Sequence, residues 1–380
     1  MRADHATSSF ACGAALGFAL DLAAGDPRRG HPVAAFGRAA AAVERRLWHD
    51  HRGWGALHTL VCAGGATAGA ALLAHAVRRP ARAAIPTRAA ARPLVRAADI
   101  ALTAAATWSV IGGTSLRREA RTIGDALAAG DLAAARQRLP HLCGRDPQAL
   151  DGQQIARAVV ESVAENTSDA VVGALVWGAL AGVPGLVGFR AVNTLDAMVG
   201  HKSPRYRRFG WASARLDDAA GWPGARLTAA LTVLGGPDPR GALRSWRSDG
   251  GAHPSPNAGP VEASFAGALG VRLGGTLAYG GRVEHRPVLN AGGRPVETGD
   301  IVRAARLSRR VAVLALATAV AARPVLRGRG LAAAVLLGAA GAARTGLRRG
   351  ARSDGDVPTA RPGATGSART RPRAAGEDGR

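Results

Sequence analysis

Acidic side chains at four-residue steps are the first candidates for chemistry. Arg157, Glu161, Glu165 and Asp169 lie in a segment rich in valine and alanine, so on a helix they form one polar stripe with apolar flanks. Carboxylates that lead into an apolar segment repel one another and are desolvated, which favours binding of a divalent cation or a cationic ligand. The simpler alternative is a solvated helix face on which Arg157 pairs with Glu161. Asn166 and the two short polar residues after it favour a site.

Further carboxylates occur between residues 190 and 220. Asn193 and Asp196 are three residues apart and share a face if the segment is helical. Asp217 and Asp218 are adjacent, and neighbours on a helix diverge by about 100°, so at most one of them faces a given ligand. Magnesium is usually held by one or two carboxylates together with substrate phosphate oxygens. The pair at 217–218 is therefore the candidate metal site.

Three more segments offer groups that could hold a substrate: a cationic patch suited to phosphate or propionate groups, a loop stiffened by prolines, and a charged segment near the N-terminus. Their candidate residues are Lys202 and Arg205 in the patch, His253, Ser255, Asn257 and Glu262 in the loop, and Asp26, Arg28 and His31 near the N-terminus. Each is also compatible with an ordinary loop charge or helix cap, and Asn257 in particular with a plain N-cap.

Long uncharged runs alternate with arginine-rich segments, a pattern typical of a multi-span membrane protein. At about 1.5 Å per residue, the run 54–77 exceeds the roughly 30 Å hydrocarbon core of a bilayer. The other candidate spans are a short first run at 10–20, a run at 100–116 and a run at 170–189 that is broken softly by Pro184. The run 311–343 contains Arg323 and two further arginines, so it predicts two short helices with Pro324 at the turn.

The predicted fold class is therefore all-α, a polytopic membrane helical protein with polar, loop-rich extramembrane segments. One membrane-embedded catalytic domain covers residues 1–343, with a soluble helical insert at about 117–164 and polar active-site loops at about 190–300. The segment 344–380 predicts a disordered arginine-rich tail.

The formal net charge of +23 does not indicate a nucleic-acid partner. Lys202 is the only lysine, the arginines are scattered, and few of them lie beside the aromatic residues that single-strand binders use for stacking. Arginines that flank apolar spans are explained more simply by membrane topology. The three cysteines and ten histidines are dispersed and predict neither a disulfide framework nor a zinc site. No GxxxxGK[ST] phosphate loop occurs.

The polar segments, taken together, resemble the adenosylcobinamide-phosphate synthase family of cobalamin biosynthesis, the CobD/CbiB type. The matching stretches are LDLAAGDPRRGHPVAAFGR, the SLRREA…GRD insert, RAVVESVAENTSDAVV, FRAVNTLDAMVGHKSPRYRRFGWASARLDD and HPSPNAGPVEASFAGALGVRLGG followed by YGG and RP. They occur in the family's order and cover most of residues 16–307. Two departures are mild: Ala170 stands where the family often has glycine, and Pro-Val-Glu follows SPNAG where a bulky residue and then Pro-Glu are common.

This resemblance implies a multi-pass protein of the cell inner membrane that acts late in corrinoid assembly. The family joins the amine of aminopropanol, as its phosphate, to the f-propionate of adenosylcobyric acid, in a reaction written with ATP. The carboxylate needs activation before it can acylate an amine, as an acyl phosphate with Mg²⁺ neutralising the phosphate oxygens. The expected partners are therefore the corrinoid, aminopropanol phosphate and the lipid bilayer, with ATP and Mg²⁺ as cofactors.

Residue chemistry suggests how the candidate positions divide the work. The stripe carboxylates, with Asp217 or Asp218, would handle metal, nucleotide or amine, and the cations Arg28, Lys202 and Arg205 would hold phosphate or propionate. The amides of Asn166, Asn193 and Asn257 would orient amide groups.

A transporter of an anionic small molecule is the alternative from another class, because intramembrane carboxylates and interrupted spans also line transport paths. The concentration of polar motifs in the segments expected to be extramembrane loops argues against it.

Overall fold

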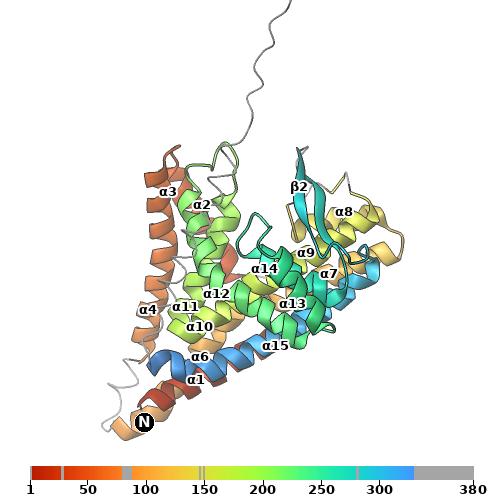
Figure 1. Ribbon diagram of the computed structural model, residues 1–380. Coiled ribbons are helices and arrows are strands. Elements are labelled where there is room, and N and C mark those ends of the chain that lie inside the picture. Colours follow the sequence, from red (N-terminus) through yellow and green to blue (C-terminus); the bar gives the residue numbers. More distant parts are fainter. Residues whose placement is uncertain are drawn as a thin grey trace, which may run out of the picture.

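The structure is a computed structural model that describes residues 2–26, 30–78, 88–144, 147–148, 150–279 and 282–328. This part of the chain is almost entirely helical, with one β-hairpin. Helices α3 and α4 form one edge of the molecule, the hairpin and α8 lie on the opposite side, and the long helix α15 runs beneath them (Figure 1).

The first half of the chain contributes helices of 7 to 23 residues and two short turns of other helical geometry. Its elements are α1 (Arg2–Ala24), α2 (Pro32–Leu47), α3 (Arg52–Thr59), the π-helical turn η1 (Leu60–Gly64), α4 (Gly65–Arg78), α6 (Arg88–Val110), α7 (Gly113–Ala128), α8 (Leu132–Arg138) and the 3₁₀ turn η2 (Leu139–His141). Helices α1 and α6 pack side by side at one end of the molecule (Figure 1).

The second half contributes the central helices, two more π-helical turns and the hairpin. Its elements are α9 (Gly152–Thr167), η3 (Ser168–Val172), α10 (Gly173–Ala181), α11 (Val183–Leu195), η4 (Asp196–Gly200), α12 (Trp211–Gly235), α13 (Pro239–Asp249), α14 (Ala258–Leu269), β1 (Leu273–Tyr279), β2 (Arg282–Leu289) and α15 (Thr298–Gly328). The strands pair antiparallel in a register that joins Leu273 to Leu289, with an irregularity before Gly275. The sequence pattern did not predict this hairpin.

Helices α9 and α14 form the centre of the core. Ile155, Val159 and Val163 of α9 are fully buried, and every residue of α14 is buried. Small side chains along α14 allow this close approach, since its sequence is AGPVEASFAGAL. The segment expected to form a separate soluble insert therefore ends in a helix that belongs to the common core.

Two helical segments are long and apolar enough to cross a membrane. One is Arg52–Arg78, where α3, η1 and α4 form a continuous 27-residue helix, and the other is Pro93–Ala128. Only 22% of the most apolar stretch of the first segment is buried, and side chains such as Leu60 and Leu72 are exposed. Exposed apolar side chains on a long helix suit contact with lipid better than contact with water.

The predicted span at 170–189 is wrong, because no continuous helix covers it. Helix α10 ends at Ala181, Gly182 adopts a positive φ of 70°, and α11 begins at Val183 with Pro184 in its first turn. Residues 170–181 instead continue the helix that begins at Gly152, and residues 183–189 belong to the next helix. Glycine permits the left-handed backbone that reverses the chain at this point.

The prediction of polar loops over 190–300 is also largely wrong. Helices α12, α13 and α14 occupy much of this range. Pro239 lies in the first turn of α13, where a missing N–H costs nothing, whereas Pro223 lies within α12. Its glycines allow close helix contacts: a Cβ at Gly224 of α12 would lie 2.8 Å from the Cα of Gly173.

The expected hairpin with a turn at Pro324 does not form, because α15 continues through this residue to Gly328. The neighbouring Arg323 is tolerated since its guanidinium donates to the carbonyls of Gly178 and Ala179 and lies over the ring of Phe10. It thereby satisfies the last carbonyls of α10. Residues 329–380, with the predicted disordered tail, lie outside the described residues.

Candidate active site

The predicted stripe lies on α9, and its first half is anchored to the hairpin. The Arg157 guanidinium donates to the carbonyl of Gly274 at 2.8 Å, and the Glu161 carboxylate accepts from the N–H of Gly274, also at 2.8 Å. Glu161 is only 4% exposed. These two side chains therefore bind the same backbone residue on β1, and Glu161 is buried with a hydrogen-bond donor.

The second half of the stripe reaches two π-helical turns. Asp169 lies in η3, and Asp196 is the first residue of η4. A π-helical turn adds one residue to a helical turn and often marks a functional site. The two turns interrupt otherwise regular helices at the positions of these carboxylates.

Five carboxylates from four elements converge at this point, and we refer to them as the acidic cluster. Its members are Glu165 of α9, Asp169 of η3, Asp196 of η4 and the pair Asp217 and Asp218 of α12. All lie outside both candidate membrane spans. Segments separated by up to about 50 residues in sequence thus place like charges together.

Burial and mutual repulsion raise the pKa of these groups. The pKa of Asp169 rises to about 7, first because of burial and then because of the charges of Glu165 and Asp196. The pKa of Asp196 rises to about 6 through burial and the charges of Asp218 and Glu165. Burial also raises the pKa of Asp217 well above its usual value, and the charges of Asp169 and Asp196 add to this. The cluster can therefore take up protons near neutral pH, or bind a cation in their place.

Asp217 and Asp218 of α12 have different side-chain partners, as expected for neighbours on a helix. The Asp217 carboxylate accepts from the side-chain amide of Asn193 at 3.4 Å, whereas the Asp218 carboxylate lies 3.5 Å from the Arg215 guanidinium. The amide oxygen of Asn193 in turn accepts from Arg190 at 3.5 Å. Asp217 is thus held toward Asn193, and Asp218 is partly neutralised by its own helix.

Asn257 joins the 253–262 segment to the same region. It occupies the N-cap position of α14, but its side chain makes no capping bond there. Instead its amide donates to the backbone carbonyl of Asp218 at 2.9 Å, and its oxygen accepts from Arg226 at 3.1 Å. A Cβ at Gly221 would lie 2.6 Å from the Asn257 amide nitrogen, so this contact requires glycine on α12.

The other residues of that segment lie beneath the hairpin. His253 Nε2 lies 3.9 Å from the Glu262 carboxylate, and both side chains are about 5% exposed or less. Burial and then the charge of Arg286 lower the pKa of His253, which keeps the imidazole neutral. The Ser255 hydroxyl accepts from the backbone N–H groups of residues 257 and 258, so it caps α14.

The N-terminal residues reach the acidic cluster through a residue that the sequence analysis missed. Burial lowers the pKa of Arg190, and the charges of Asp26 and Asp169 oppose this, so its guanidinium lies near both carboxylates. His31 Nε2 is 3.8 Å from Asp26. Its position three residues before Asn193 could have identified Arg190 as part of the same helix face. Arg28 lies outside the described residues.

The two cations of the predicted patch have different surroundings. Lys202 is exposed, and its charge lowers the raised pKa of Asp218. Arg205 instead lies 3.3 Å from the Glu44 carboxylate and over the ring of Trp48. The Tyr206 hydroxyl donates to the same carboxylate at 2.8 Å. Arg205 is therefore engaged by protein groups outside the acidic cluster.

Among the described residues, no three His, Cys, Asp or Glu side chains form a group that could hold a metal ion by themselves. Magnesium needs no such cage, because it is commonly bound by one or two carboxylates and completed by substrate phosphates and water. Asp217, whose carboxylate is held by Asn193, fits that role better than Asp218, whose carboxylate lies beside the Arg215 guanidinium.

The comparisons with known proteins point to one family. The family model described as CobD/Cbib protein matches residues 14–308. "Cobalamin biosynthesis protein CobD" of Mycobacterium tuberculosis is 50% identical over 322 residues, covering 83% of this chain and 97% of that protein. The proteins of the same name from Chromobacterium violaceum and Geobacter metallireducens are 43% identical over 307 residues and 42% identical over 286 residues. These alignments cover 79% and 73% of this chain, and 94% and 86% of the respective relatives.

No solved structure matches the chain. The matched range 14–308 contains the acidic cluster, the α9 stripe and the 253–262 segment. On this match, and on relatives that are up to 50% identical over most of its length, the chain belongs to the CobD/Cbib family of cobalamin biosynthesis proteins.

Proposed function

We propose that this chain forms the amide bond between the amine of aminopropanol phosphate and the f-propionate of adenosylcobyric acid. The observation that carries the proposal is the acidic cluster, where segments distant in sequence meet and the pKa of Asp169 lies at about 7. Such a cluster attracts an ammonium group, and a carboxylate with this pKa can take a proton from it at neutral pH.

The reaction needs an activated acid, since a carboxylate does not acylate an amine spontaneously in water. In the proposed sequence, the propionate oxygen takes the terminal phosphoryl group of ATP and ADP leaves. The bound ammonium group first gives one proton to Asp169. The amine nitrogen then attacks the acyl carbon, phosphate departs, and the second proton lost by nitrogen leaves with the phosphate.

Neighbouring residues have supporting roles in this scheme. Glu165 and Asp196 bind the ammonium group and keep the pKa of Asp169 high. Asn193 orients Asp217, and these two residues would hold Mg²⁺, which when bound neutralises phosphate oxygens. Lys202, which is exposed near Asp218, provides a mobile cation for phosphate.

The proposal also places the chain in the cell inner membrane as a multi-pass protein. Two candidate spans with exposed apolar side chains support this placement. Fractionation of cells that produce the tagged chain provides the check. The protein should remain in the membrane pellet after an alkaline carbonate wash, and release into the soluble fraction would contradict the placement.

Mass spectrometry of corrinoids in cells that lack this chain tests the reaction. Cobyric acid should accumulate and cobinamide phosphate should be absent, and the native gene should reverse both changes. Glu165→Gln and Asp217→Asn should fail to restore the product although both proteins are present in the membrane. Glu297→Gln removes an exposed carboxylate outside the cluster and serves as the matched control. Restoration by both cluster variants would remove the proposal.

A transporter is the second candidate, because α10 and α11 form an interrupted helix pair beside buried charges. Purified protein in lipid vesicles distinguishes the two functions. Amide product from corrinoid, amine and ATP supports the enzyme, whereas uptake of aminopropanol phosphate without covalent product supports the transporter.

A further inference from the structure

We infer that a second site, beneath the hairpin, binds an oxyanion, namely a phosphate or carboxylate group of a substrate. This inference deepens the proposed function and rests on it. The site is a cavity of about 140 Å³ between the first turns of α9, the start of β1 and the segment after β2. Its lining includes the side chains of Gln153, Gln154, Arg157 and Arg272 and the backbone of Gly274 and Gly275.

The lining of this cavity is suited to an anion. It contains two guanidinium groups and two side-chain amides, and none of its residues is acidic. Guanidinium groups present several donors in a planar arrangement and bind phosphate and carboxylate through two parallel hydrogen bonds. The N-terminus of α9 adds little, because the Asp151 side chain already accepts from the Gln154 N–H. The two arginines therefore supply the positive charge that would bind the anion.

The start of β1 lines the cavity with two glycines. Gly274 and Gly275 both adopt positive φ values, 77° and 85°, where the register of the hairpin is irregular. A Cβ at Gly274 would lie 2.2 Å from the carbonyl oxygen of Pro287, so only glycine fits. The bond from Arg157 to the Gly274 carbonyl then holds one guanidinium at the wall of the cavity.

Of the arginines near the cavity, two pair with a buried carboxylate, and Arg272 is available to bind an anion. Arg294 and Arg303 both pair with the buried Asp300, at 2.7 and 2.6 Å. Arg272 follows Gly270 and Val271 in the same region, and its backbone N–H donates to the carbonyl of Arg294. Its side chain, however, forms no ion pair with another described side chain. One of the three neighbouring arginines thus has no counter-ion among the described side chains and lines a cavity.

The cavity and the acidic cluster lie along one helix. Arg157 and Glu165 are eight residues apart on α9, which at about 1.5 Å per residue separates them by about 12 Å. One end of the stripe therefore attracts anions and the other attracts cations. A bound anion in the cavity stays apart from the ammonium group, so the cavity holds a substrate group other than the reacting carboxylate.

Direct binding by the purified full-length chain tests this site. Equilibrium dialysis with radiolabelled inorganic phosphate measures Kd at fixed ionic strength, and propionate is added as a competitor to compare the two anions. Arg272→Gln should raise Kd by about tenfold or more, because it removes a charged hydrogen-bond donor, and tenfold corresponds to about 1.4 kcal/mol. Competition by propionate at similar concentration identifies a carboxylate site, and lack of competition identifies a phosphate site.

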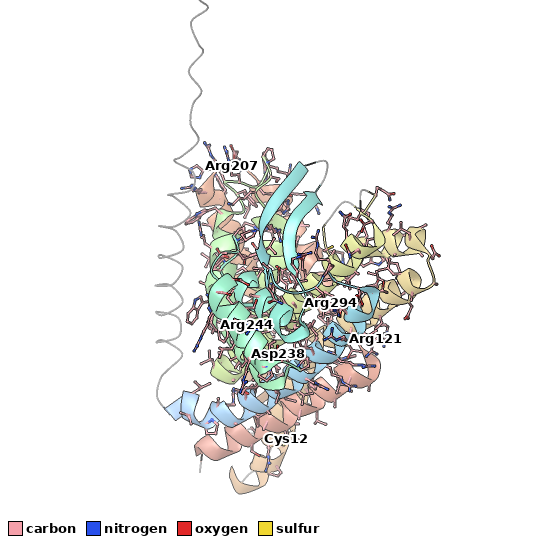
Figure 2. All side chains as sticks on the ribbon, turned by 45° about the vertical axis from the view of Figure 1, so that its right-hand side comes forward. Cys12, Arg121, Arg207, Asp238, Arg244 and Arg294 are labelled. Atoms are coloured by element: carbon pink, nitrogen blue, oxygen red, sulfur yellow. The ribbon has the colours of Figure 1, made fainter. Side chains whose placement is uncertain are left out.

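Arg244→Gln is the matched control. Arg244 is an exposed arginine on α13 that does not line the cavity, whereas Arg294 marks the base of the hairpin (Figure 2). The control should bind phosphate as the native chain does. Failure of the native chain to bind either anion, or equal Kd values for the two variants, would overturn the site. A thermal melt of each variant excludes unfolding as the cause of lost binding.

The two proposals can fail separately. Glu165→Gln, which should block amide formation, should leave phosphate binding intact because Glu165 lies about 12 Å from the cavity. If this variant still makes amide while Arg272→Gln loses phosphate, only the proposed function falls. If it makes no amide but Arg272→Gln binds phosphate normally, only the anion site falls.

Discussion

The two halves of the α9 stripe have the same sequence spacing but different surroundings. In the first half, Arg157 and Glu161 bind the backbone of Gly274. In the second half, Glu165 and Asp169 face other carboxylates, and the pKa of Asp169 rises to about 7. A regular polar stripe can therefore be a structural anchor at one end and a reactive site at the other. What decides between them is the partner that the fold supplies.

The largest expected effect comes from the reactive half. Asp169→Asn removes the proposed base, so amide formation should fall by about 100-fold or more. In the native chain, the rate should rise as the pH increases through about 7, because the base must be deprotonated. Rate measurements between pH 5.5 and about 8.5 check both points. An Asp169→Asn variant with the native pH profile would show that another group accepts the proton.

The Asp169 carboxylate should lower the free energy of unfolding at neutral pH. The pKa of Asp169 is higher in the folded chain than its usual value of 3.8, so its contribution to stability is complete below about pH 4 and is lost as the pH rises through about 7. Asp169→Asn should therefore melt at a higher temperature than the native chain at pH 7.5 and show a weaker pH dependence. Thermal melts in detergent from pH 4.5 to about 8 measure this, and a lower melting temperature at pH 7.5 would contradict it.

In the first half of the stripe, removal of a carboxylate should lower the stability of the chain instead of raising it. Glu161→Ala leaves the Gly274 N–H buried without its acceptor, which should cost about 1–3 kcal/mol of unfolding free energy. Glu161→Gln retains an acceptor oxygen and should cost less. Urea unfolding of both variants provides the measurement. Equal stability of the two variants, with amide formation lost in both, would show that Glu161 takes part in the reaction and is not a structural anchor.

The smallest effect is expected outside the stripe. Arg205 pairs with Glu44 near the surface, so Arg205→Gln should change the rate of amide formation by less than about fivefold. The same corrinoid assay measures it. A larger loss would mean that Arg205 leaves Glu44 to bind substrate, as the sequence pattern alone had suggested.

Several features of the site could be predicted from the sequence because they depend on local periodicity. The four-residue spacing predicted a polar stripe, and the adjacency of Asp217 and Asp218 predicted their divergence. A soft break at Pro184 was expected within one apolar span, but not the end of one helix and the start of another at Gly182, because hydropathy does not report where a helix ends. Arg190 was missed since its importance depends on Asp26 and Asp169, which lie far from it in sequence.

The sequence by itself determined the family of this protein, the positions of two long apolar helices and the residue types available for chemistry. Only the tertiary structure decided which carboxylates meet, that Asn257 binds α12 instead of capping α14, and that a hairpin covers the first half of the stripe. The physical reason is that periodicity reports on neighbours within a few residues. Charge repulsion and burial, which set the pKa of Asp169, come from groups that the fold brings together across the chain.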